Sequence, residues 1–125
     1  MPQYKSRAER QIGDLLAEHQ IPFIYEKPTA VIDGKHTKIW YPDFSLEWGL
    51  IIEYFGITDN KDYTEQARHK LKVYRENQFS ILPIYARDLV PNWQEYLIER
   101  IGSTLENRLR VIRRNQMSDR EIIKS

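Results

Sequence analysis

The chain contains no cysteine, so neither disulfide bonds nor thiolate-bound metals contribute to its fold or chemistry. It also lacks any apolar run near the roughly 20 residues that a membrane-spanning helix requires. The opening segment MPQYKSRAER has no apolar signal-peptide core. From these absences we expect a soluble, cytoplasmic protein that makes no contact with a membrane.

Several catalytic signatures are missing as well. There is no glycine-rich phosphate loop, and no serine or cysteine triad suggests itself. The histidines His19, His36 and His69 do not form a pair at metal-ligand spacing. We therefore expect no organic cofactor and no histidine-bound metal.

A strong excess of either charge is absent, because the net charge is only +1. The charge is unevenly distributed, however, with −3 on residues 1–60 and +4 on residues 61–125. An acidic site between basic flanks would hold a phosphate backbone. A solvated surface of uneven charge explains the same numbers, and charge alone favours that second interpretation.

What is present is enough for one folded domain: 125 residues, of which 41% are hydrophobic. Apolar periodicity and turn residues predict an α-β-β-β-α-β-α order, an α/β fold with a mixed sheet flanked by helices. Ser6 and Glu9 form a capping box for the first helix, and Asp62 is a plausible cap for the second. The expected elements are helices at 7–19, 62–77 and 92–116, strands at 22–32, 37–46, 50–56 and 80–89, a turn at 33–35, and a tail at 117–125.

The stretch YPDFSLEWGLIIEYFG, residues 41–56, contains two acids that need an explanation. Glu53 lies inside an apolar strand, where an unpaired carboxylate is unfavourable. A three-residue hairpin loop at Glu47–Gly49, with its glycine in the left-handed conformation, would place Asp43 directly opposite Glu53. A two-residue loop would instead place the two carboxylates on opposite faces, so the prediction depends on the loop length.

Two carboxylates at one place repel each other, and a divalent cation removes that conflict. Oxygen-only ligation suits Mg²⁺, with Mn²⁺ as a substitute. Such an ion lowers the pKa of a bound water and stabilises charge on a phosphate, which is the chemistry of a phosphodiesterase. Alternatively, Asp43 merely ends a strand and Glu53 is a half-exposed strand residue.

The segments PDF at 42–44 and IIEYFG at 51–56 resemble the PD-(D/E)xK, restriction-endonuclease-like nuclease superfamily. The order of elements over about residues 6–90 is similar too. The resemblance implies a single nuclease-like domain over residues 1–125 with a three-layer core and a C-terminal helical extension at about 92–116. It also implies a Mg²⁺-dependent DNA endonuclease that leaves a 3′-hydroxyl and a 5′-phosphate.

Residue roles follow from the same resemblance. Asp43 and Glu53 would bind the metal together with the backbone carbonyl of Tyr54. Glu9 would hold a metal-bound water or a second ion, although its capping-box role explains it without any chemistry.

The sequence departs from the motif in one respect, since Phe55 occupies the position of the lysine. Either the lysine has moved or the site is inactive. On the helix at 62–77, Lys70 shares one face with Tyr63, Gln66 and Tyr74. Lys70 would orient the attacking water and stabilise the phosphate, with Gln66 positioning substrate or water. A solvent-facing lysine is the alternative.

Two further features concern partners. The segment ENRLRVIRRNQ is a basic amphipathic helix that suits DNA phosphates or a second subunit, and its exposed arginines are Arg108, Arg110, Arg113 and Arg114. Trp48, in the hairpin turn, could stack on a base. A homodimer follows from the resemblance, because cutting both strands needs two sites.

Three functions remain open at this stage. The leading one is a Mg²⁺-dependent DNA endonuclease, whether a restriction or homing enzyme, a junction resolvase or a repair nickase. The second is a catalytically inactive nucleic-acid-binding or assembly module that keeps the nuclease fold, favoured by Phe55. The third is a nuclease that acts on RNA.

Overall fold

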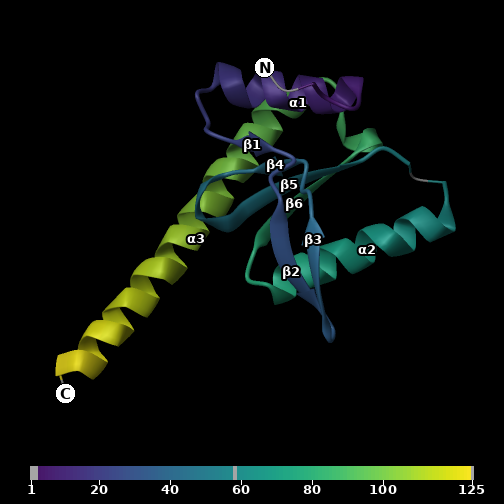
Figure 1. The fold of residues 1–125 in the computed structure, drawn as a ribbon. Coiled ribbons are helices and arrows are strands. Elements are labelled where there is room, and N and C mark those ends of the chain that lie inside the picture. The colour runs from purple at the N-terminus through teal and green to yellow at the C-terminus, as the bar shows by residue number, and fades with distance from the viewer. Residues whose placement is uncertain (1–2, 58, 125) are drawn as a thin grey trace.

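The structure, a computed structural model, describes the backbone of residues 3–57 and 59–124 and the side chains as far as residue 116 (Figure 1). Its elements are α1 (Arg7–Glu18), β1 (Ile24–Tyr25), β2 (Thr29–Asp33), β3 (His36–Trp40), β4 (Phe44–Ser45), the 3₁₀ turn η1 (Glu47–Gly49), β5 (Leu50–Phe55), α2 (Lys61–Glu76), β6 (Ser80–Tyr85), the 3₁₀ turn η2 (Ala86–Asp88) and α3 (Trp93–Lys124).

The main sheet is mixed, with four strands in the order β1-β4-β5-β6. Strands β1, β4 and β5 are antiparallel, whereas β5 and β6 run parallel and are joined through α2. Strands β2 and β3 form a separate antiparallel hairpin. The predicted α/β class with a mixed sheet flanked by helices is confirmed.

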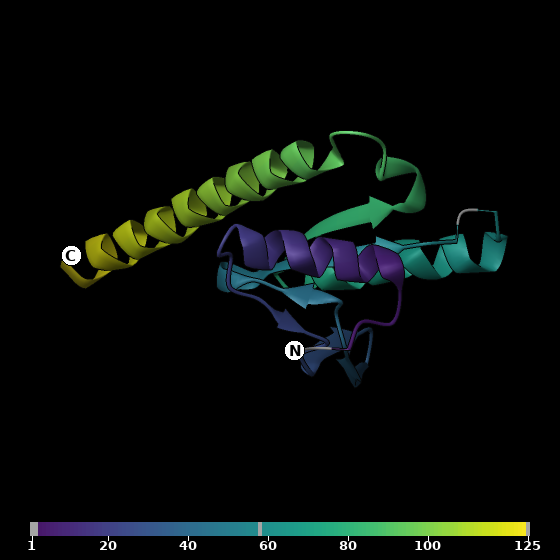
Figure 2. The same ribbon diagram turned by 90° about the horizontal axis from the view of Figure 1, so that it is seen from above.

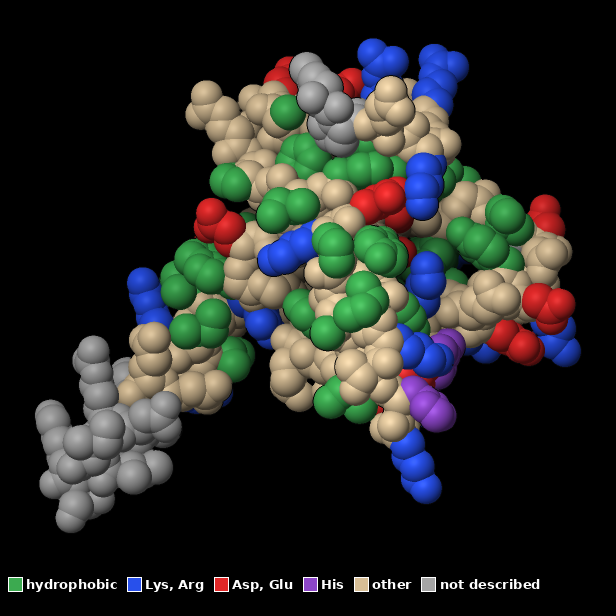
Figure 3. All heavy atoms as spheres, in the orientation of Figure 1, with side chains coloured by type: hydrophobic (Ala, Val, Ile, Leu, Met, Phe, Trp, Pro, Cys, Tyr) green, Lys and Arg blue, Asp and Glu red, His purple; other side chains and the backbone are tan. Residues whose placement is uncertain are grey.

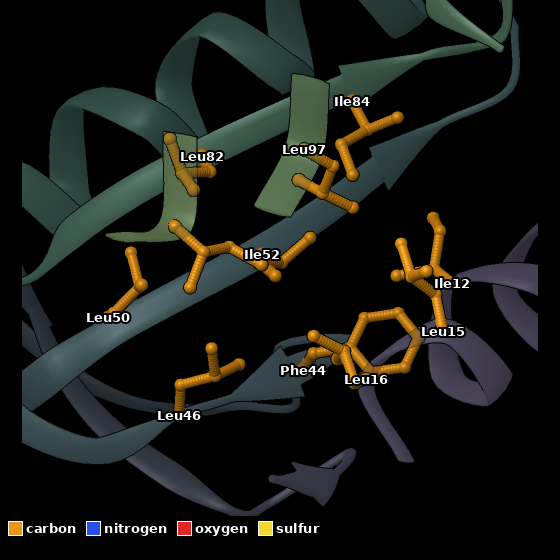
Figure 4. Packing of buried hydrophobic residues seen from close by; sticks show 11 residues of the cluster. Ile12, Leu15, Leu16, Phe44, Leu46, Leu50, Ile52, Leu82, Ile84 and Leu97 are labelled. Atoms are coloured by element: carbon orange, nitrogen blue, oxygen red, sulfur yellow. The ribbon is translucent and has the colours of Figure 1, made fainter. Parts of the chain in front are cut away.

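The two faces of β5 bury different side chains, as the alternation of a strand requires. Leu50 and Ile52 pack against α1 and the start of α3, through the cluster shown in Figure 4. Ile51 and Phe55 face the opposite way, against α2 and Val31 of the β2–β3 hairpin. Glu53 shares the side of Ile51 and Phe55, so the fold turns its carboxylate toward α2.

Caps set where the first two helices begin. The Ser6 side chain accepts a hydrogen bond from Glu9 N at 3.1 Å, which is the N-cap half of the capping box predicted for α1. The Glu9 carboxylate accepts from Ser6 Oγ and not from Ser6 N, so the other half is not formed. For α2 the predicted cap Asp62 is wrong, because the helix begins earlier and the Asn60 side chain accepts from Tyr63 N at 3.0 Å. Asp62 lies in the first turn, where its negative charge complements the helix dipole.

The predicted strands at 22–32 and 37–46 are each divided in two. The first separates into β1 and β2 at a segment that contains Pro28, and the second into β3 and β4 at Tyr41 and Pro42. Proline has no N–H to donate to a strand ladder, so pairing stops there. The chain therefore leaves the main sheet, forms the hairpin against α2, and returns. The predicted turn is present, with Gly34 at φ +63°.

Helix α3 is longer than predicted, since it continues through Gly102 and past residue 116 to Lys124. Leu97 and Ile101 pack into the core, whereas the later turns extend away from the sheet (Figures 1 and 2). Arg108 anchors the middle of the helix by donating to the carbonyls of Trp48 and Gln78. Among the described residues, no helix has the length and apolar character that crossing a bilayer requires.

Candidate active site

The hairpin between β4 and β5 places the two acids opposite each other. Its three-residue turn is closed by Leu46 N donating to Leu50 O at 2.8 Å, and Ser45 pairs with Ile51. This register confirms the predicted loop length. The turn differs in one respect, because Trp48 (φ +59°) adopts the left-handed conformation as well as the glycine that follows it.

Each carboxylate holds the backbone of the opposite strand. Asp43 N donates to Glu53 Oε1 at 2.9 Å, and Tyr54 N donates to Asp43 Oδ2 at 2.7 Å. One oxygen of each acid is thereby fixed in position. The other oxygens, Asp43 Oδ1 and Glu53 Oε2, receive no hydrogen bond from the residues that the structure describes, which leaves one ligating oxygen on each acid.

Helix α2 supplies a positive charge to this pair. Lys70 Nζ lies 3.9 Å from Glu53 Oε2. A hollow of about 190 Å³ brings together five of the residues that the sequence singled out, which are Asp43, Glu53, Tyr54, Gln66 and Lys70. Tyr63, Phe55 and Ala67 complete the lining. Tyr63 was placed on the correct helix face from periodicity but was not assigned to the site.

The environment disfavours the charge on both acids. Burial, followed by the charge of Glu53, raises the pKa of Asp43 to about 7, although the Tyr54 N–H and Lys70 oppose the rise. Burial also raises the pKa of Glu53, which is 3% exposed, against the opposing effects of Lys70 and the Asp43 N–H. A pair in this state is stabilised by binding a proton or a cation.

Phe55, which occupies the position of the motif lysine, is part of the hydrophobic core. Phe55 is buried and packs its ring on Tyr85 at 5.5 Å and on Tyr63 at 6.4 Å. A lysine there would lose this aromatic packing. The other two nearby lysines are directed elsewhere, because Lys38 pairs with Asp33 and Lys72 pairs with Glu76.

Glu9 is close enough to act on the pair through its charge but does not line the hollow. Its buried carboxylate accepts from Ser6 Oγ at 2.8 Å and from Tyr25 Oη at 2.7 Å. Both of its oxygens are therefore engaged. Within the described part of the chain, no three Asp, Glu or His side chains gather closely enough to form a metal-binding group.

The predicted nucleic-acid contacts lie outside the hollow. Trp48 is exposed and borders a separate, largely apolar groove beside β1 and η1. Arg108 has a structural role, since its guanidinium binds two backbone carbonyls. The other three arginines that the sequence singled out, Arg110, Arg113 and Arg114, are exposed.

The donor set fits a magnesium ion. Mg²⁺ takes one or two protein carboxylates and keeps several waters, so it does not need a third acid. Asp43 and Glu53 each retain one oxygen, and both have a raised pKa that a cation would offset. On the face of the molecule that Figure 3 shows, acidic side chains lie beside lysine or arginine side chains.

Comparisons with known proteins bear on the fold. No protein-family model matches the sequence, and no curated protein matches it. Among solved structures, the chain is similar to the catalytic domain of the homing endonuclease I-Bth0305I, with a TM-score of 0.52 and 19% identity. The match covers 83% of this chain and 94% of that one. The chain therefore has a fold like that of a homing endonuclease catalytic domain.

Proposed function

We propose that this protein is a metal-dependent endonuclease that hydrolyses phosphodiester bonds in DNA. The observation that carries the proposal is the arrangement of Asp43, Glu53 and Lys70 in one hollow, on a fold like that of a homing endonuclease catalytic domain. Two acids removed from water beside an ammonium are poorly explained by stability, since their pKa values are raised rather than lowered.

Asp43, Glu53 and the backbone carbonyl of Tyr54 are the groups that would hold Mg²⁺, or Mn²⁺ in its place. When bound, the ion supplies Lewis-acid charge to the phosphate and makes water more acidic. The reciprocal hydrogen bonds between Asp43 and the Glu53–Tyr54 segment keep both carboxylates in place before substrate arrives. Such preorganisation removes a cost that flexible side chains would otherwise incur during the reaction.

Lys70 acts on the phosphate and the attacking water. Its ammonium donates a hydrogen bond to the phosphate as negative charge develops there, and it orients the water. The amide of Gln66, one helical turn earlier, positions water or substrate within the same hollow. Water attacks phosphorus opposite the 3′ oxygen, so the P–O3′ bond breaks and the products carry a 3′-hydroxyl and a 5′-phosphate.

The protein would act on both DNA strands as a homodimer. Helix α3 extends beyond the body with its apolar side chains Leu105, Leu109 and Ile112 half-buried. An α-helix turns by 100° per residue, which places the basic residues on a different side of α3: Arg110, Arg113 and Arg114. The apolar side suits a second copy of the chain, and the basic side suits DNA phosphates.

A catalytically inactive nucleic-acid-binding or assembly module is the second candidate. Phe55 in the motif-lysine position supports it, as does the ion pair between Lys70 and Glu53, which would hold the fold together without any reaction. Cleavage of RNA is a third candidate, because metal chemistry at a phosphate does not itself distinguish the sugar.

One experiment separates these candidates. Supercoiled plasmid, a four-way DNA junction and a structured RNA are incubated with wild type and Asp43→Ala in Mg²⁺, Mn²⁺ or EDTA. We expect cutting of DNA by wild type with either metal, none in EDTA, and none by the variant. Binding of DNA in a gel shift without cutting would favour the inactive module, and cutting of RNA alone would replace DNA as the substrate.

A further inference from the structure

A second hollow lies beside the candidate active site. It has a volume of about 250 Å³ and is bounded by the end of β5, the first turns of α2, and the segment after β6. Three residues, Phe55, Tyr63 and Ala67, line both hollows, so the two lie side by side. A nucleic-acid strand bound at Asp43 would therefore have the second hollow next to it.

The second hollow is positively charged. Arg68 of α2 and Arg87 of η2 line it, and no Asp or Glu side chain does. Within the described part of the chain, neither arginine forms a salt bridge. The neighbouring carboxylate, Asp88, accepts instead from Tyr85 N at 2.8 Å. Both guanidinium groups thus keep their donors for a ligand.

The floor of this hollow holds one arginine in place. The Arg87 guanidinium lies 4.6 Å from the centre of the Tyr85 ring, and Tyr85 stacks on Phe55. A guanidinium over an aromatic ring loses little further freedom when it binds an anion. Thr64 contributes no donor, because its hydroxyl donates to Asn60 O at 3.0 Å. The two guanidinium groups are the charged donors of this hollow.

The opposite side of the active site differs in charge. A groove there shares Gln66 and Lys70 with the active-site hollow and includes Trp40, but Asp62 and Glu65 also line it. Two carboxylates repel a phosphate backbone, whereas two arginines attract it. Of these two hollows, the arginine hollow suits a phosphate better.

We propose that Arg68 and Arg87 bind a phosphate group of the nucleic-acid strand next to the phosphate held at Asp43 and Glu53. Guanidinium groups match phosphate oxygens in geometry and charge. This inference rests on the proposed function for its ligand, since the phosphate belongs to the strand that would be cut at the acids.

Binding to DNA in EDTA tests the proposal independently of cleavage. Arg68→Gln, Arg87→Gln and the control Arg75→Gln, an exposed arginine in the last turn of α2, are compared with wild type by fluorescence anisotropy on a short duplex over a range of salt concentrations. We expect each of the first two changes to weaken binding roughly tenfold. The slope of log K against log salt should fall by about 1 for each, with the control unchanged.

A cleavage assay then locates the phosphate. On a duplex whose cut position has been mapped, the linkages on either side are replaced one at a time by neutral methylphosphonates. For wild type, the KM should rise about tenfold when one of the two linkages is neutral. For Arg68→Gln, making that same linkage neutral should raise the KM no further. Unfolding midpoints equal to wild type exclude a folding defect.

The outcomes separate the two proposals. If the chain binds DNA with a reduced slope in both arginine variants but never cuts, the phosphate site stands and the nuclease proposal fails. If the chain cuts DNA while both variants bind with the wild-type slope, the phosphate site is overturned and the nuclease proposal stands.

Discussion

Replacing Asp43 with asparagine should stabilise the metal-free protein at alkaline pH. The folded-state pKa of Asp43 is about 7, well above the value of 3.8 for an unperturbed side chain. Between these values the folded protein holds a proton that the unfolded chain has released. Wild-type stability at this group is therefore lost as the pH rises through that window, and asparagine, which does not ionise, removes the loss.

The magnitude follows from the size of the shift. Each pKa unit corresponds to about 1.4 kcal/mol, so a rise of about 3 units is worth on the order of 4 kcal/mol at about pH 8. This is an upper value, because Asp43 is not fully buried and water screens part of its charge. Asparagine keeps an oxygen that can accept from Tyr54 N, so the hairpin contact is retained.

Urea unfolding of both proteins in EDTA from about pH 4 to pH 8 measures the effect. The stability of Asp43→Asn relative to wild type should rise from near zero at the acid end to a few kcal/mol at the alkaline end. Asp14→Asn is the control, since Asp14 is exposed and pairs weakly with Arg10, and it should show no such trend. A constant difference between Asp43→Asn and wild type across the pH range would refute the reasoning.

Five other substitutions, two of them matched controls, have expected results. Lys70→Ala should lower the single-turnover rate of DNA cleavage by about 10² to 10³, while Lys72→Ala, whose ammonium pairs with a glutamate on the same helix, should cut at the wild-type rate. Gly49→Ala should lower the free energy of unfolding in urea by about 1 to 3 kcal/mol, because φ is +78° and the new Cβ would lie 2.7 Å from Arg108 Nη2. Gly102→Ala should raise the free energy of unfolding by up to about 1 kcal/mol, because Gly102 is a helical position with open space around it. Arg108→Ala should cost about 1 to 3 kcal/mol in the same assay, because two carbonyls lose a charged donor, and no change would contradict its anchoring role.

Local patterns in the sequence were enough to predict the geometry of the acid pair. The loop at Glu47–Gly49 determines the register, and strand alternation then places Asp43 and Glu53 on one side. Helical periodicity placed Lys70 and Gln66 on one face of α2. These relations depend on residues that are close in sequence, so no knowledge of the tertiary structure was needed.

Features that depend on distant segments were not predicted. The β2–β3 hairpin leaves the main sheet because it packs on α2, where Asn77 bonds the backbone of Ile32, 45 residues away. Arg108 is predicted to contact DNA, and its carbonyl partners in the η1 turn and before β6 were not foreseen. A sequence pattern shows that such residues are polar and does not show which distant carbonyl they will bind.

The most direct test of the central claim is the effect of Glu53→Gln on DNA cleavage. The amide keeps an oxygen that can accept from Asp43 N, so the hairpin is preserved while the negative charge of Glu53 is removed. With saturating Mg²⁺ and a substrate that wild type cuts, we predict a loss in single-turnover rate of at least about 10². A variant that cuts at the wild-type rate would show that this pair of acids is not where the reaction takes place.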